Sequence, residues 1–113
     1  MTKGKVVLVP FPFDDLSASK VRAAVCLTES FGPHRHVVLA FITSVLPSPP
    51  TETDLVLTAT DPGFGQTGLK VPSALRLHRL LTVSMSLIVR QLGALSRDQQ
   101  KAVEDRLRYL FGL

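Results

Sequence analysis

The chain has 113 residues, of which 45% are hydrophobic and 19% are charged. This balance is typical of one compact domain, residues 1–113, and not of a disordered tail. The longest apolar run, residues 37–42, is far shorter than the roughly 20 residues that cross a bilayer, so no membrane contact is predicted. Thirteen Lys and Arg against nine Asp and Glu give a net charge of +4, which favours an anionic partner such as nucleic acid.

The cysteine content and the N-terminal residues indicate in which cellular compartment the protein is expected. Cys26 is the single cysteine, which excludes an internal disulfide and fits a reducing cytoplasm. It lies within an apolar stretch, which predicts a small buried side chain and not a nucleophile. Pro10 and Pro12 interrupt the first apolar run, so a signal peptide is not predicted.

Short apolar segments separated by Pro- and Gly-rich stretches run through most of the chain. They predict six strands, at residues 5–11, 21–28, 36–44, 54–58, 74–80 and 85–92. The second of these is apolar at almost every position, which predicts burial on both faces. The fifth alternates, which places Arg76 and His78 on one face and Leu75, Leu77 and Arg79 on the other.

The last predicted element is an amphipathic helix. Ser96-Arg-Asp-Gln99 has the form of a capping box, and Gly112 ends the pattern. The helical stripe consists of Ala102, Val103, Leu107, Leu110 and Phe111. Short strands followed by one such helix predict an α+β, mainly β fold, in which the helix packs on a small curved barrel or half-barrel.

Two kinds of site are poorly supported by the residues. His34 and His36 lie in a turn without carboxylates or thiolates at ligand spacing, so no metal site is predicted. Gly63, Gly65 and Gly68 resemble a nucleotide-binding spacing, but no Lys-Ser/Thr pair follows and no helix opens there. The sequence therefore predicts no cofactor.

Arg22 is the strongest candidate for a charged functional residue. It follows a polar loop and begins an apolar strand, so its guanidinium is held by the strand yet can reach a phosphate lying over the loop. Taken alone, the stretch fits a solvated strand-end residue better. Thr43 ends another predicted strand, where its hydroxyl fits either a phosphate oxygen or a backbone group that it caps.

Such residues can act on RNA without a metal. The RNA 2′-hydroxyl already lies beside the phosphate to be cleaved, so a protein needs only to align it and to stabilise the developing charge. One arginine on the phosphate, one hydroxyl on a non-bridging oxygen and one proton acceptor are sufficient in principle.

Several blocks occur in the order found in a known family. They are Lys3-Gly-Lys-Val-Val-Leu-Val-Pro-Phe-Pro-Phe-Asp-Asp-Leu-Ser17, Lys20-Val-Arg22-Ala-Ala-Val-Cys-Leu27, Ala40-Phe-Ile-Thr-Ser44, Gly68-Leu-Lys-Val-Pro-Ser73 and Leu81-Thr-Val83. Taken together, and over nearly the whole chain, they resemble the MazF/PemK family, the toxins of bacterial type II toxin–antitoxin systems.

The resemblance implies an SH3-like small barrel (MazF/PemK/CcdB-like) with a C-terminal helix, assembled as a homodimer. It further implies a metal-independent, cofactor-free endoribonuclease that cuts single-stranded RNA, namely mRNA, at short sequences. The products would be a 2′,3′-cyclic phosphate and a 5′-hydroxyl, and a cognate antitoxin protein would neutralise the toxin in the cytoplasm.

The resemblance also assigns roles by position. It implies that Arg22 and Thr43 are catalytic, and the chemistry of the imidazole adds His78 as a third candidate. The RNA-binding residues it implies are Ser17, Ser19, Lys20, Ser44 and Arg76. His78 stands where other members carry an acidic or amide residue; as an imidazole it fits a general base or acid, and it fits packing or contact with a base edge equally well. Phe13 and Phe64 are the loop aromatics expected to stack on RNA bases.

A second interpretation remains open. Ala23 replaces the usual Pro after the family's arginine, and residues 14–20 lack the family's usual loop signature. The chain would then be a non-catalytic or degenerate member that acts through protein–protein binding, for example by topoisomerase inhibition. The candidate contact residues at the helix end are Leu107, Leu110, Phe111 and Leu113, which fit a stripe covering the barrel as well.

Overall fold

The computed structural model describes residues 1–11 and 20–113. In this part of the chain the strands are β1 (Lys5–Phe11), β2 (Lys20–Cys26), β3 (His36–Thr43), β4 (Asp54–Leu57), β5 (Ser73–Ser84) and β6 (Arg90–Ala94). A single α-helix, α1 (Arg97–Phe111), follows them, and two short 3₁₀ turns, η1 (Gly65–Thr67) and η2 (Met85–Leu87), lie beside β5 and β6 along the chain. None of the helices in these described ranges has the length and apolar character needed to cross a membrane.

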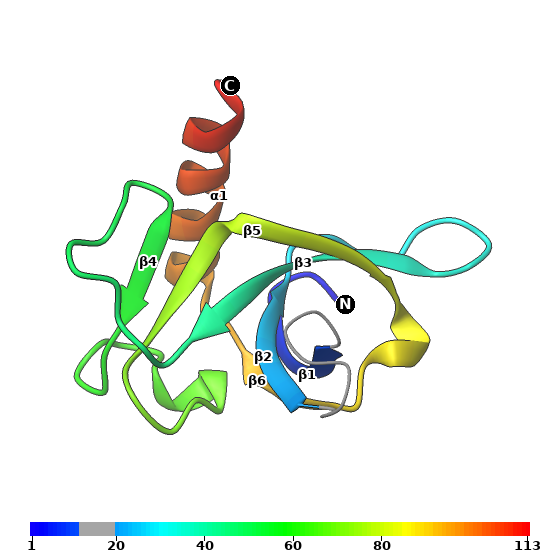
Figure 1. Cartoon of the computed structure of the whole chain (residues 1–113), viewed down its shortest axis with the longest axis horizontal. Coiled ribbons are helices and arrows are strands. Elements are labelled where there is room, and N and C mark those ends of the chain that lie inside the picture. The colour runs from blue at the N-terminus through cyan, green and yellow to red at the C-terminus, as the bar shows by residue number, and fades with distance from the viewer. Residues whose placement is uncertain (12–19) are drawn as a thin grey trace.

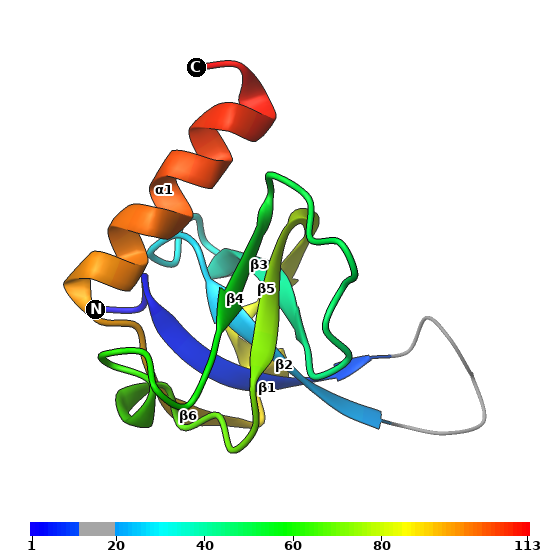
Figure 2. The ribbon, with the colours of Figure 1, turned by 90° about the vertical axis from the view of Figure 1, so that its left-hand side faces the viewer.

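The six strands form one antiparallel sheet in the order β4-β5-β3-β2-β1-β6. The sheet curls strongly, and α1 stands against one side of it (Figure 1). In the second view α1 runs beside β4, and its first turn lies close to the N-terminus (Figure 2). The predicted mainly β half-barrel with a C-terminal helix is therefore confirmed.

Both faces of the curled sheet are covered by apolar side chains. One core cluster contains Val6, Val25 and Val103, and so joins β1, β2 and α1. The other cluster contains Val7, Cys26 and other residues that lie on the opposite face of the same strands. The prediction that the second strand is buried on both faces holds for Ala24–Cys26 of β2, whereas Lys20–Arg22 are exposed.

Helix α1 begins and ends as its sequence predicts. The Ser96 hydroxyl accepts from the Gln99 backbone N–H at 3.1 Å, and the Gln99 side chain accepts from the Ser96 N–H at 2.8 Å, so the capping box is complete. Gly112 ends the helix in the left-handed region, with a φ of 71°. Val103 is buried and Leu107 packs on the same core cluster, so this face holds the helix on the sheet.

The last two strands differ from the prediction. β5 extends to Ser84, well beyond residue 80, and the predicted strand at 85–92 is replaced by η2 followed by β6. The Ser84 hydroxyl accepts from the Ser86 N–H, a local bond that favours a turn over an extended strand.

A large bulge interrupts the pairing of β5 with β3. Ala40 pairs with Leu80, whereas the next residue of β3, Phe41, pairs with Arg76. The intervening β5 residues, Leu77–Arg79, therefore have no partner on β3. Leu77 remains buried, and both His78 and Arg79 are exposed. The predicted alternation is wrong for Arg79, because the bulge turns its side chain out of the core.

Candidate functional site

A cleft of about 280 Å³ opens where β2 begins and β3 ends, beside β5. It is lined by Arg22, Phe41, Ile42, Thr43, Val45, Arg76 and Arg79. The cleft brings together three of the residues predicted from the sequence, Arg22, Thr43 and Arg76, although they come from three different strands. It contains three guanidinium groups and, among the lining residues that the structure describes, no carboxylate, so it is suited to an anion.

Two of these guanidinium groups carry uncompensated charge. Arg22 is exposed in β2, opposite Val9 of β1, and Arg79 is exposed in the β5 bulge. Within residues 1–11 and 20–113, neither side chain forms a hydrogen bond or an ion pair. Each therefore retains its donors for a ligand.

Thr43 is half-buried at the end of β3, and its hydroxyl has a local partner. The oxygen accepts a hydrogen bond from the Val45 N–H at 3.1 Å, and the Val45 carbonyl lies 3.4 Å away. The capping role considered for this residue is thus present. It also fixes the hydroxyl at the wall of the cleft, so the two interpretations of Thr43 are compatible.

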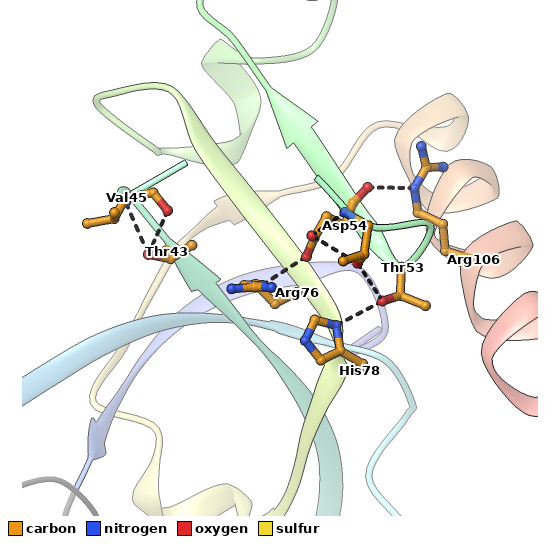
Figure 3. A network of polar contacts seen from close by, with 8 residues as sticks. Thr43, Val45, Thr53, Asp54, Arg76, His78 and Arg106 are labelled. Atoms are coloured by element: carbon orange, nitrogen blue, oxygen red, sulfur yellow. Dashed lines mark hydrogen bonds and ion pairs between the residues drawn. The ribbon is translucent and has the colours of Figure 1, made fainter. Parts of the chain in front are cut away.

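Arg76 is held by a buried carboxylate. Its Nε donates to Asp54 Oδ1 at 2.9 Å, and Asp54 is only 4% exposed (Figure 3). The backbone N–H and the hydroxyl of Thr51 both donate to Asp54 Oδ2, at 2.8 and 3.0 Å. Burial raises the pKa of the Asp54 carboxyl, but these hydrogen bonds and the Arg76 charge outweigh it, and the pKa lies below its ordinary value.

His78 is exposed and lies at the other end of the same network. Its Nδ1 is 2.8 Å from the hydroxyl of Thr53, which in turn lies 3.2 Å from the hydroxyl of Thr51 (Figure 3). His78 is not among the residues that line the cleft, although its neighbour Arg79 is. The catalytic role assigned to His78 stays a prediction.

The remaining predicted residues lie outside the cleft or outside the described ranges. Lys20 begins β2 and Ser44 follows β3; both are exposed, and neither lines the cleft. Ser17 and Ser19, like Phe13, fall outside the described residues. Phe64 is only 8% exposed within the core, so the expectation that it stacks on RNA is wrong.

Two residues of the site were missed in the sequence. Asp54 was predicted only as the first residue of a strand, with no role in a site, yet its carboxylate is buried against Arg76. Arg79 was assigned to the face of Leu75 and Leu77. An arginine on an apolar strand face is itself a signal, because an unpaired buried charge costs several kcal/mol, and a bulge avoids that cost.

The structure confirms the predicted burial of Cys26. Cys26 is buried, and this burial raises the pKa of its thiol to about 11, so the nucleophilic thiolate is scarce at neutral pH. The rings of His34 and His36 lie 5.9 Å apart. Within the described part of the chain, no group of three or more His, Cys, Asp or Glu side chains could hold a metal ion.

Comparison with known proteins identifies the family. Residues 2–111 match the model of the PemK-like, MazF-like toxins of type II toxin–antitoxin systems. The chain belongs to this family. The resemblance seen in the ordered sequence blocks is therefore confirmed. No curated protein sequence matches the chain at a significant level.

Solved structures of such toxins share the fold. A Mycobacterium tuberculosis toxin, MazF-mt6, superposes with a TM-score of 0.71 at 21% identity, over 96% of this chain and 97% of that one. An endoribonuclease in complex with its cognate antitoxin, from a mycobacterial species, gives 0.73 at 13% identity, over 100% and 96%. MazF in a MazE–MazF complex from Deinococcus radiodurans gives 0.70 at 16% identity, over 100% and 96%. At these identities the likeness is one of fold.

Proposed function

We propose that this PemK/MazF-like toxin is an endoribonuclease that cleaves single-stranded mRNA at short sequences. The observation that carries the proposal is the cleft, which is lined by Arg22 and Thr43 from neighbouring strands and in which Arg22 and Arg79 have no charged partner among the described residues. Fold neighbours described as endoribonucleases add support. Two finer points are also part of the proposal: cleavage at defined sequences and independence from metal ions.

The proposed reaction uses the RNA as its own nucleophile. Arg22 binds a non-bridging oxygen of the scissile phosphate, and the Thr43 hydroxyl lies against the same group. The 2′-oxygen forms a bond to phosphorus while the bond from phosphorus to O5′ breaks. The 2′-proton passes to a base, for which we propose His78, and O5′ takes up a proton from water. The products are a 2′,3′-cyclic phosphate and a 5′-hydroxyl.

Two partners belong to the proposal. The described neighbours include toxin–antitoxin complexes, and we propose that a cognate antitoxin binds this chain in the cytoplasm and competes for the charge of the cleft. We also propose a homodimer. Leu87 at the end of η2 and Val89 just after it expose 50% and 58% of their surface, and this apolar surface suits a second copy of the chain. A monomeric mass in light scattering would argue against the dimer.

The decisive experiment compares wild-type protein with Arg22→Ala on a long single-stranded RNA in EDTA. We expect discrete cuts with 5′-hydroxyl ends from the wild type, and a loss of about 100-fold or more in kcat/KM for the variant, because the group that stabilises the phosphate charge is gone. Arg90→Ala is the matched control, since Arg90 is an exposed strand arginine outside the cleft.

Either of two outcomes would refute the assignment. Equal cleavage by Arg22→Ala and wild type would remove Arg22 from the mechanism. An absence of cleavage by folded wild-type protein, with growth arrest retained in cells, would favour the non-catalytic alternative. A specific observation keeps that alternative open: Tyr109, Phe111 and Leu113 expose 62%, 60% and 89% of their surface at the end of α1.

A further inference from the structure

Hydrogen bonds link Asp54 to His78 through two threonine hydroxyls, and the donor and acceptor of each bond can be deduced. The links run from Asp54 to the Thr51 hydroxyl at 3.0 Å and from Thr51 to the Thr53 hydroxyl at 3.2 Å. The last link, from Thr53 to His78 Nδ1 at 2.8 Å, can be followed in Figure 3. A hydroxyl has one proton to donate and can accept as well. The orientation of one link therefore constrains the next.

The carboxylate fixes the first link. The pKa of Asp54 lies below its ordinary value, so at neutral pH the group is ionised and can only accept. The Thr51 hydroxyl must then donate its single proton to Asp54 Oδ2. Because this proton is used, Thr51 can take part in the next link only as an acceptor, and the proton between the two threonines comes from Thr53.

The same reasoning shows which ring nitrogen of His78 carries the proton. With its proton on Thr51, the Thr53 hydroxyl has only lone pairs to offer His78, so Nδ1 must be the donor in the 2.8 Å contact. The opposite tautomer would break the link between Thr51 and Thr53. Only the order with Nδ1 as donor gives the buried Thr53 hydroxyl both a donated and an accepted hydrogen bond within the network.

We propose that Asp54, acting through Thr51 and Thr53, orders these protons so that neutral His78 carries its proton on Nδ1 and presents an unprotonated Nε2. In Figure 3 the second ring nitrogen points away from Thr53. Thr51, Thr53 and Asp54 are thus positioning residues. Their relevance to catalysis rests on the proposed ribonuclease function, in which Nε2 accepts the 2′-proton; the tautomer itself does not depend on it.

The inference is tested by the ring ¹⁵N and ¹³C chemical shifts of His78, measured in alkaline solution, because these shifts distinguish the two neutral tautomers. Wild-type protein should carry the proton on Nδ1. Thr51→Val frees the proton of Thr53, which can then be donated to the ring, so the proton of His78 should move to Nε2. Thr51→Ser keeps the hydroxyl and should restore the wild-type shifts. Thr60→Val, an exposed threonine in the loop after β4, is the control.

The outcomes separate this inference from the proposed function. Wild-type protein with the proton on Nε2, or an unchanged tautomer in Thr51→Val, would overturn the proton order whatever the enzyme does. If the wild type cleaves RNA, Thr51→Val should lose at least fivefold in kcat at neutral pH with little change in KM, and Thr51→Ser should recover it. Unchanged kcat together with a switched tautomer would show that His78 takes no part in the reaction, and would still support the proposed proton order.

Discussion

Asp54 is the residue on which the polar side of the site depends. Its carboxylate positions Arg76, and its backbone oxygen accepts from Arg106 of α1 at 3.1 Å. Three donors converge on the two carboxylate oxygens within hydrogen-bond distance. A neutral amide of the same shape could not accept them all, because half of its polar groups are donors.

We therefore predict that Asp54→Asn lowers the free energy of unfolding by about 1–3 kcal/mol at pH 7. The lowered pKa of Asp54 means that its stabilising contribution is complete above its unfolded pKa of about 3.9 and is lost as the pH falls through the lower folded value. The difference between wild type and variant should shrink in the same acidic range. Urea unfolding from pH 7 down to pH 3 measures both.

Glu52→Gln is the control for Asp54→Asn. Glu52 lies two residues away but is exposed, so its replacement should change stability by no more than about 0.5 kcal/mol. A difference between Asp54→Asn and wild type that persisted unchanged to pH 3 would show that the variant is destabilised by something other than a lost carboxylate charge.

Helix α1 presents two apolar surfaces with different roles. Val103 and Leu107 pack on the core cluster, whereas Phe111 and Leu113 at its end are largely exposed. The sequence grouped Leu107 with the exposed residues as one candidate contact surface. The structure divides this set, because the chain leaves the body of the protein in the last turn of the helix (Figure 2).

Substitutions should separate these surfaces. The double variant Phe111→Ala/Leu113→Ala should keep the wild-type stability within about 0.5 kcal/mol, while Leu107→Ala should lose about 1–2 kcal/mol of buried apolar contact. Under the ribonuclease proposal the double variant still cleaves RNA and arrests growth. Loss of growth arrest with full RNA cleavage would instead identify the helix end as the surface that acts on a partner. Thermal unfolding, an RNA-cleavage assay and a growth assay measure these outcomes.

Prediction from the sequence succeeded where a pattern was local. The first three strands and the capping box at Ser96 depend on neighbouring residues, and their positions were predicted to within a few residues. The bulge at Leu77–Arg79 depends on the register between β3 and β5, which are far apart along the chain, and so alternation alone misplaced Arg79. The burial of Asp54 likewise depends on Arg76 and Arg106, residues that no local pattern brings to it.

At the scale of the whole molecule, the net charge is +4, and the positions of the basic groups that lack an acidic partner determine how this charge acts on a ligand. Arg22 and Arg79 face one cleft without a partner in the described residues, whereas Arg76 is neutralised by Asp54. A strand of RNA carries one charge per nucleotide, so the cleft can engage a phosphate with each free arginine. Binding of RNA should then depend steeply on salt.

We predict that Arg79→Ala weakens the binding of a short 2′-O-methyl RNA, which cannot be cleaved because its 2′-hydroxyl is blocked. The slope of the logarithm of affinity against the logarithm of salt concentration should fall by about 0.7, the value expected for one phosphate contact on a single strand. Arg90→Ala should leave the slope unchanged. Fluorescence anisotropy between 50 and 200 mM salt, a range in which such slopes are well determined, measures this. Equal slopes for all three proteins would exclude Arg79 from phosphate contact.

The Gly-rich segment 61–68 covers one edge of the sheet and so limits how that edge can pair with another chain. A Cβ on Gly93 would lie 2.1 Å from the Gln66 carbonyl oxygen, and one on Gly68 would lie 2.2 Å from that of Leu92, so the segment is seated backbone against backbone on β6. At the opposite margin of the sheet, Arg106 of α1 donates to the Asp54 carbonyl of β4. Both marginal strands are thus guarded against strand addition, the usual route to aggregation.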